Sequence, residues 1–100
     1  MVLYINTTDR KHVEVSLKNK GKVIAAIAEE NQIGSQVLLP LIEKILKQEK
    51  LEYKDLSGIE VETGPGSFTG IRVGVSVANA LGFSLGILVN SKKIEDKLVY

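Results

Sequence analysis

Residues 64–74 read GPGSFTGIRVG, and this stretch carries more information than any other part of the chain. A β-branched and acidic run, residues 59–63, comes before it, and a run of small and apolar residues, 75–81, follows it. This order predicts a strand, a glycine turn and a helix. The first two glycines can adopt positive φ, and the proline between them has a fixed φ, so the turn is expected to be tight.

The start of the predicted helix is a candidate anion site. Backbone N–H groups at such a junction point outward and attract anions. Gly64, Gly66, Ser67 and Thr69 are therefore candidates for binding a phosphate, and both Ser67 and Thr69 are competent N-caps. However, no Lys-Ser/Thr pair follows the glycines as in a P-loop, and G-x-G-x-x-x-G is not the dinucleotide spacing. A tight strand-to-helix turn without a ligand is the alternative.

The complete string resembles the signature of the bacterial TsaB (YeaZ) family, in which a strand ends in G-P-G-S-F-T-G-[LI]-R-[IV]-G. Residues 2–91 resemble the first half of that family, whose members belong to the machinery that makes threonylcarbamoyladenosine in tRNA. The resemblance implies a cytoplasmic, non-catalytic scaffold subunit that docks on a TsaD-like catalytic subunit, with a TsaE-like ATPase joining them. TsaB proteins usually continue into a second subdomain, so residues 1–100 are expected to form the N-terminal domain alone.

Composition limits the possible functions. One hundred residues correspond to one domain, and 44% hydrophobic and 25% charged residues are ordinary globular values. The formal net charge is +1 with mixed signs along the chain, so no footprint for direct nucleic-acid binding is visible. There is no cysteine, which fits a cytosolic protein. No apolar run approaches the roughly 20 residues of a membrane span, and no signal peptide is recognised.

The predicted elements run β-β-β-α-β-α-β in a five-stranded mixed sheet, the arrangement of a ribonuclease H-like or actin-like half-domain. The first strand is expected to be central and covered on both faces, and a hairpin turn at 19–21 joins the next two. Ser35 is the expected N-cap of the first helix, and Pro40 predicts a kink or a late start. The expected elements are strands at 2–5, 12–18, 23–28, 59–63 and 85–89, helices at 36–48 and 69–83, and a short helix within 90–100.

Both helices carry features of a contact surface. The apolar residues of 36–48 cover an arc of roughly 200°, whereas an ordinary surface helix needs about 100°. In the second helix Gly70, Gly74 and Ala78 form a smooth ridge that another helix can approach closely. We expect these surfaces to dock on TsaD, or to form a symmetric homodimer in isolation. Deeper burial of the first helix, and its packing on the ridge within the domain, are the alternatives. The predicted interface is Ser35, Leu38, Leu41, Ile42, Ile45, Gly70, Arg72, Gly74, Val75 and Ala78.

The residues offer little for catalysis, and no cofactor or metal is expected. Nucleotide-binding relatives of the fold have an Asp after the first strand, where this chain has Asn6, a turn former. His12 is the one histidine, so a two-histidine metal site is impossible within the chain. Glu14, Glu60 and Glu62 suggest a solvated sheet face more than a nuclease site.

Arg72 in the first helical turn opposes the helix dipole, so something negative is expected beside it. Candidates are Glu60, Glu62 or another internal carboxylate, an anion at the glycine turn, or an acidic residue of a partner. Two functions of other classes remain as alternatives: a phosphate- or nucleotide-binding enzyme that uses the turn at residues 64–70, and a metal-dependent nuclease.

Overall fold

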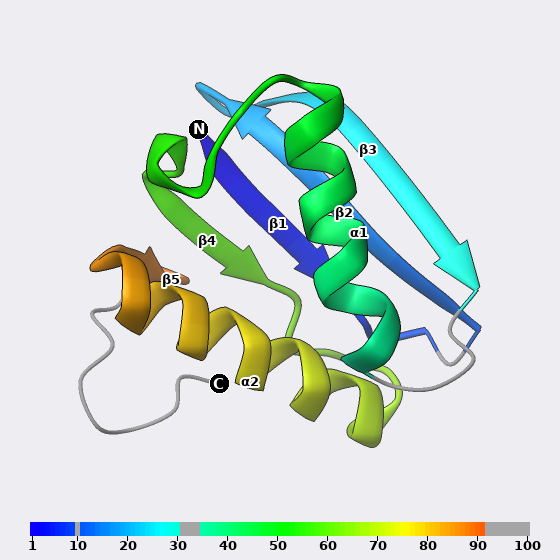
Figure 1. Cartoon of the computed structure of the whole chain (residues 1–100). Helices are drawn as coiled ribbons and strands as arrows, with labels where there is room; N and C mark the ends of the chain where they lie inside the picture. The colour runs from blue at the N-terminus through cyan, green and yellow to red at the C-terminus, as the bar shows by residue number, and fades with distance from the viewer. Residues whose placement is uncertain (10, 31–34, 92–100) are drawn as a thin grey trace.

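The computed structural model describes residues 1–9, 11–30 and 35–91, and these residues build one mixed sheet and two helices (Figure 1). The sheet has five strands in the order β3-β2-β1-β4-β5. This confirms the predicted fold class and element order. The elements are β1 (Val2–Asn6), β2 (His12–Asn19), β3 (Lys22–Glu30), α1 (Ser35–Gln48), the short 3₁₀ helix η1 (Tyr53–Asp55), β4 (Gly58–Val61), α2 (Phe68–Leu85) and β5 (Leu88–Val89).

The central strand β1 sets the topology. It pairs antiparallel with β2 on one side and parallel with β4 on the other, and β4 pairs parallel with β5. Lys20 and Gly21 form the two-residue turn between β2 and β3, with φ of 52° and 80°. Positive φ at both positions matches the right-handed twist of the two strands, so this local sequence specifies the hairpin.

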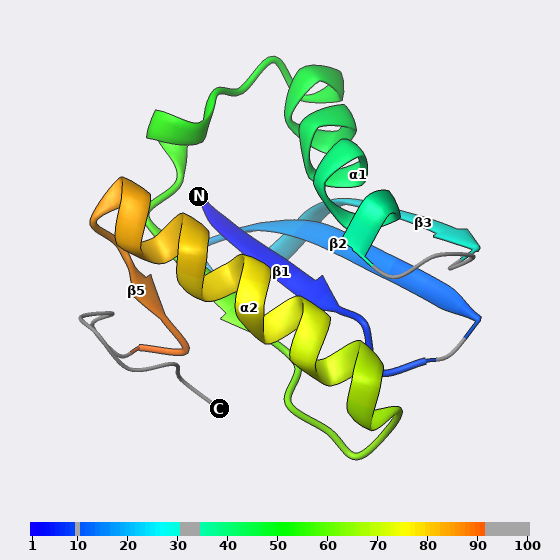
Figure 2. The ribbon, with the colours of Figure 1, turned by 60° about the horizontal axis from the view of Figure 1, so that its bottom comes forward.

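Both helices lie on the same side of the sheet (Figure 2). The strands alternate, and one set of side chains points toward the helices to form a single core. Leu56, together with the partly buried Leu51 and Tyr53, covers one end of that core. The buried apolar side chains are Leu3, Ile5, Val13, Val15, Leu17, Leu38, Leu41, Ile42, Ile45, Leu46, Leu56, Ile59, Val61, Val75, Ala78 and Val89.

The other face of the sheet carries a polar network, which corrects the expectation that β1 is covered on both faces. Tyr4 is only half-buried there, and its hydroxyl donates to Glu62 Oε2 at 3.2 Å. Lys18 Nζ lies 4.8 Å from the centroid of the Tyr4 ring and 3.7 Å from Glu60 Oε1. Glu60 and Glu62 thus lie on a polar sheet face, as the sequence suggested.

The first helix and the last strand differ from their predicted limits. Helix α1 starts at Ser35, before Pro40, so the predicted late start is wrong. The side chain of Ser35, the expected N-cap, lies outside the described residues. The strand expected at 85–89 is shorter, because α2 continues to Leu85 and ends at Gly86, whose φ of 68° gives a left-handed C-cap. The helix predicted within 90–100 falls almost wholly on residues 92–100, which are not described.

Helix α2 is more apolar than its glycines and serines suggest. Among the described helices it is the one that is long and apolar enough to cross a membrane by length and composition alone, with a mean hydropathy of 1.2 over 18 residues. The sequence-based search for an unbroken apolar run overlooked it. Its small residues Gly74 and Ala78 are buried, and it packs against β4, β1 and β5.

Tyr4 makes the stability of the sheet depend on pH. Burial, and then the neighbouring Glu62 carboxylate, raise the pKa of Tyr4 above its ordinary 10.0. The unfolded chain therefore loses this proton at a lower pH than the folded chain, so the free energy of unfolding falls as the pH rises above about 10. We predict that Tyr4→Phe makes this fall shallower, measured by urea unfolding at several pH values between about 9 and 11. An unchanged pH slope in the variant would contradict the assigned cause.

Candidate protein interface

The glycine turn is fastened to the loop that follows β1. Asn6 Oδ1 accepts hydrogen bonds from the Thr8 backbone N–H at 3.0 Å and from the Thr8 hydroxyl at 2.7 Å, which confirms Asn6 as a turn former. The Thr8 carbonyl in turn accepts the Ser67 N–H at 2.7 Å. A backbone hydrogen bond therefore joins the loop after β1 to the start of α2.

Ser67 caps helix α2. Its hydroxyl accepts the Gly70 N–H at 3.3 Å, and its carbonyl accepts the Ile71 N–H at 2.9 Å. Of the two N-caps that the sequence allowed, Ser67 is the one used, and Thr69 lies inside the first turn. The fold brings the four phosphate candidates to one junction, but the Ser67 and Gly70 N–H groups are already engaged within the chain. Their role in phosphate binding stays a prediction.

The glycines of α2 accept the loop after β1. A Cβ on Gly70 would collide with the Thr7 carbonyl oxygen, and a Cβ on Gly74 would collide with the Thr7 hydroxyl. The Thr7 hydroxyl itself donates to the Gly70 carbonyl. The smooth ridge therefore receives neither helix α1 nor a helix of another protein at these positions. The sequence showed that something approaches closely, but which segment does so was decided by the fold.

We predict that Gly70→Ala destabilises the chain because the new Cβ meets a backbone oxygen that cannot move without shifting β1. Overpacking of this kind costs about 1–3 kcal/mol or more. Gly58→Ala is the matched control, since a Cβ there meets its nearest atoms at 3.7 and 3.9 Å, which are ordinary contacts. Thermal or urea unfolding of both variants checks this, and equal stabilities would contradict the packing argument.

Most residues of the predicted interface belong to the chain's own core, and this corrects the surplus-surface argument. The leucine and isoleucine side chains of α1 that were assigned to a partner are at most 2% exposed, and Val75 and Ala78 are fully buried. Helix α1 packs on β2 and β3 and also on α2, so two neighbours use its wide apolar arc. The corrected residues are Leu38, Leu41, Ile42, Ile45, Gly70, Gly74, Val75 and Ala78.

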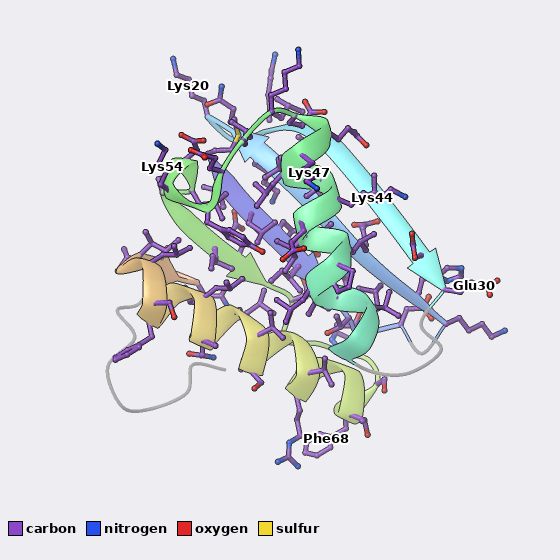
Figure 3. All side chains as sticks on the ribbon, viewed as in Figure 1. Lys20, Glu30, Lys44, Lys47, Lys54 and Phe68 are labelled. Carbon is purple, nitrogen blue, oxygen red and sulfur yellow. The ribbon has the colours of Figure 1, made fainter. Side chains whose placement is uncertain are left out.

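The outer sides of the two helices nevertheless form an open groove, which we call the helix groove. Its volume is about 480 Å³. Phe68 is 73% exposed and Leu39 is 43% exposed, which are high values for large apolar side chains. The Phe68 side chain points away from the body of the molecule (Figure 3). The residues that line the groove are Leu39, Phe68, Thr69, Arg72, Val73, Ser76 and Val77.

Arg72 belongs to this groove and contacts an aromatic ring. Its guanidinium carbon lies 5.7 Å from the centroid of the Phe68 ring, one helical turn away. Within the described residues no ion pair joins Arg72 to a carboxylate: Glu60 is paired with Lys18, and Glu62 accepts from Tyr4. The expected internal carboxylate partner is therefore wrong for these residues. The exposed Arg72 guanidinium therefore lies over the exposed Phe68 ring at the edge of the helix groove.

Sequence reasoning missed the apolar lining of the groove. Phe68 and Arg72, and Val73 and Val77, are each spaced four residues apart, so each pair shares a side of α2. The sequence contains this spacing. However, the two pairs lie on either side of the buried face of α2, and only the packed structure shows which face of the helix is buried.

The carboxylates do not assemble a metal site in the described part of the chain. No group of three or more metal-ligating side chains occurs among those residues. His12 Nδ1 lies 3.6 Å from Asp9 Oδ2 at the exposed start of β2. Among these residues, the carboxylates therefore do not form the cluster that a metal-dependent nuclease would need.

Comparison with known proteins identifies the family. The family model described as "TsaD: tRNA N6-adenosine threonylcarbamoyltransferase" matches residues 12–90. The tRNA threonylcarbamoyladenosine biosynthesis protein TsaB of Buchnera aphidicola subsp. Schizaphis graminum is 36% identical over 88 residues, which cover 87% of this chain and 41% of that protein. The chain belongs to this family, in its TsaB (YeaZ) group.

Other TsaB proteins and their TsaD relatives agree with this assignment. The TsaB protein of Escherichia coli is 34% identical over 67 residues, 67% of this chain and 29% of its own length. The tRNA N6-adenosine threonylcarbamoyltransferase of Tropheryma whipplei is 44% identical over 73 residues, 71% of this chain and 18% of that enzyme.

The solved structure described as YeaZ from Pseudomonas aeruginosa has the same fold. It matches with a TM-score of 0.79 and 27% identity, over 88% of this chain and 41% of that one. The chain thus spans about two-fifths of the length of the Buchnera TsaB protein and of the Pseudomonas YeaZ structure. The match supports the ribonuclease H-like half-domain that the order of elements predicted.

Proposed function

We propose that this TsaB-type chain takes part in forming threonylcarbamoyladenosine in tRNA, as a non-catalytic scaffold in the cytoplasm that docks on a TsaD-like catalytic subunit. The family membership supports the process, because a relative named for this biosynthesis is 36% identical over 88 residues and the family model matches residues 12–90. The observation that supports docking is the helix groove, where two helices leave apolar side chains exposed side by side.

The groove has the composition of a binding hot spot. Aromatic and arginine side chains dominate binding energies in protein interfaces, and they do so when they fill pockets on the partner. Phe68 and Arg72 stand together at one end of the groove, and Val73 and Val77 supply an apolar floor. The proposal therefore keeps the two predicted helices and Arg72, but it places the contact on their outer sides.

The chemistry of the groove indicates what the partner presents. A helix with small or apolar side chains fits between α1 and α2, and an acidic residue beside it would compensate Arg72. The TsaD-like subunit belongs to the same family as this chain and is expected to offer a matching helix pair. In the absence of that subunit, two copies of this chain would use their grooves on each other. A TsaE-like ATPase would join the assembled pair.

The loop after β1 supports a scaffold role, because its residues are engaged within the chain. Asn6 and Thr8 bond to each other, and Thr7 packs on α2, so the loop that carries an acidic residue in nucleotide-binding relatives is used here for packing. A nucleotide-handling role would need a ligand that competes with these bonds. Isothermal titration calorimetry with ATP and ADP distinguishes the two functions, since the scaffold proposal expects weak binding or none.

We predict that Phe68→Ala weakens binding to a TsaD-like subunit by about 2 kcal/mol, roughly 30-fold in Kd, because the exposed ring is the largest apolar side chain in the groove. Binding is measured by surface plasmon resonance with both purified proteins. Lys54→Ala is the control, since Lys54 is exposed on η1, away from Phe68 (Figure 3). Equal affinities of the two variants, with both chains folded by circular dichroism, would refute the groove as the docking surface.

A further inference from the structure

We propose that the free edge of β3 pairs antiparallel with β3 of a second copy of this chain, which joins two sheets edge to edge and leaves both helix grooves open. This contact is separate from the docking proposed above, because β3 and the helix groove lie on different elements. Strand β3 lies at the edge of the sheet, where β2 is its one strand neighbour among the described residues.

The edge is long and unprotected along most of its length. Strand β3 has nine residues, and Figure 1 places it at the outer margin of the sheet, with α1 over its inner side. An edge strand presents unpaired backbone N–H and C=O groups to any strand that approaches. Proteins usually block such edges with proline or charges, but residues 23–28 (VIAAIA) contain neither. Val23 and Ile24 are 57% and 46% exposed.

The charges of β3 select a second copy as the occupant. The strand begins with Lys22 and ends with Glu29 and Glu30, and its centre carries no charge. Lys20 and Glu30 mark its two ends in Figure 3. In an antiparallel pair of two copies, the basic end of each strand lies beside the acidic end of the other. A parallel pair would instead place like charges side by side, which is unfavourable.

One register fits the centre of the strand. Centring the two-fold axis on Ala26 places Ala25 opposite Ile27 and, because Ile24 is an extra residue, brings Lys22 of each copy to the Glu29–Glu30 end of the other. A two-fold axis perpendicular to the sheet also keeps the helices of both copies on the same face, and the edge contact by itself closes as a dimer.

Two features weaken this contact, but they leave the preference for an antiparallel second copy. The register between β2 and β3 shifts beside Lys18, so that Ile24 is an extra residue in β3, and such bulges hinder edge pairing. Glu29 Oε1 already forms an ion pair with Lys44 Nζ of its own chain, at 3.5 Å. Glu30 and Lys22 are exposed, and among the described residues neither forms an ion pair within the chain. They are therefore the charges to test.

The test is a charge exchange followed by sedimentation equilibrium at low salt. Lys22→Glu and Glu30→Lys are each expected to weaken dimerisation roughly 3- to 30-fold, because each replaces two attractive pairs by two repulsive ones. The double variant Lys22→Glu/Glu30→Lys restores the attraction with the signs exchanged, so its dimerisation is expected to return close to that of the original chain. Circular dichroism checks that all three variants fold.

Association through the helix groove is separated by carrying out the same series in a chain with Val73→Glu. Dimers that persist with Val73→Glu and disappear with Lys22→Glu support the β3 edge. Dimers that disappear with Val73→Glu and are unaffected by Lys22→Glu overturn the edge and leave groove docking intact. Failure of the double variant to recover also overturns it, as does a chain that is monomeric at all concentrations.

Hydrogen exchange gives a second measurement that does not depend on a substitution. Outward-facing amides of β3 are expected to exchange more slowly as the protein concentration rises, because pairing protects them. Amides of β4 serve as the internal control, since both edges of β4 are already paired. Exchange in β3 that is independent of concentration, in a sample that sediments as a dimer, would overturn the proposal.

Discussion

The close contact between the loop after β1 and the first turns of α2 holds this structure together. Thr7 lies against Gly70 and Gly74, and the Thr8 carbonyl accepts a hydrogen bond from the Ser67 N–H. This contact fixes where α2 begins and how closely it lies on β1 and β4. Because α2 is fixed there, Phe68 and Arg72 stand at the end of the helix, and the groove beside α1 has its shape. Small residues in α2 thus determine the position of the larger, exposed side chains at the helix groove.

The sheet is covered by helices on one face, and this arrangement separates the molecule into three different surfaces. The helix side contains the core and the groove, the opposite face carries the Tyr4, Lys18 and Glu60 network, and β3 forms an edge. The groove is apolar with a cation at one end, whereas the open face is polar and internally paired. The edge is apolar in its centre and oppositely charged at its ends. Each surface therefore suits a different kind of contact.

The candidate site was only partly predictable. The sequence drew attention to both helices and to Arg72, and those elements do line the groove. It assigned the wrong side of each helix, however. A wide apolar arc signals that a helix has more than one neighbour, but it does not say whether the second neighbour belongs to another protein or to the same chain. Here the second neighbour of α1 is α2, so residues such as Leu38 and Ile42 are buried in the core.

Local sequence determined the elements, because their signals act over a few residues. The alternation of apolar and polar residues predicts β2, and the Lys20-Gly21 turn predicts the hairpin. Ser67 and the glycine turn predict the start of α2. The family signature and the order of elements gave the fold class. The tertiary structure alone decided that the α2 glycines receive Thr7 and that Phe68 stays exposed. These outcomes depend on contacts between residues about 60 positions apart, and no local pattern encodes which distant segment will fill a given space.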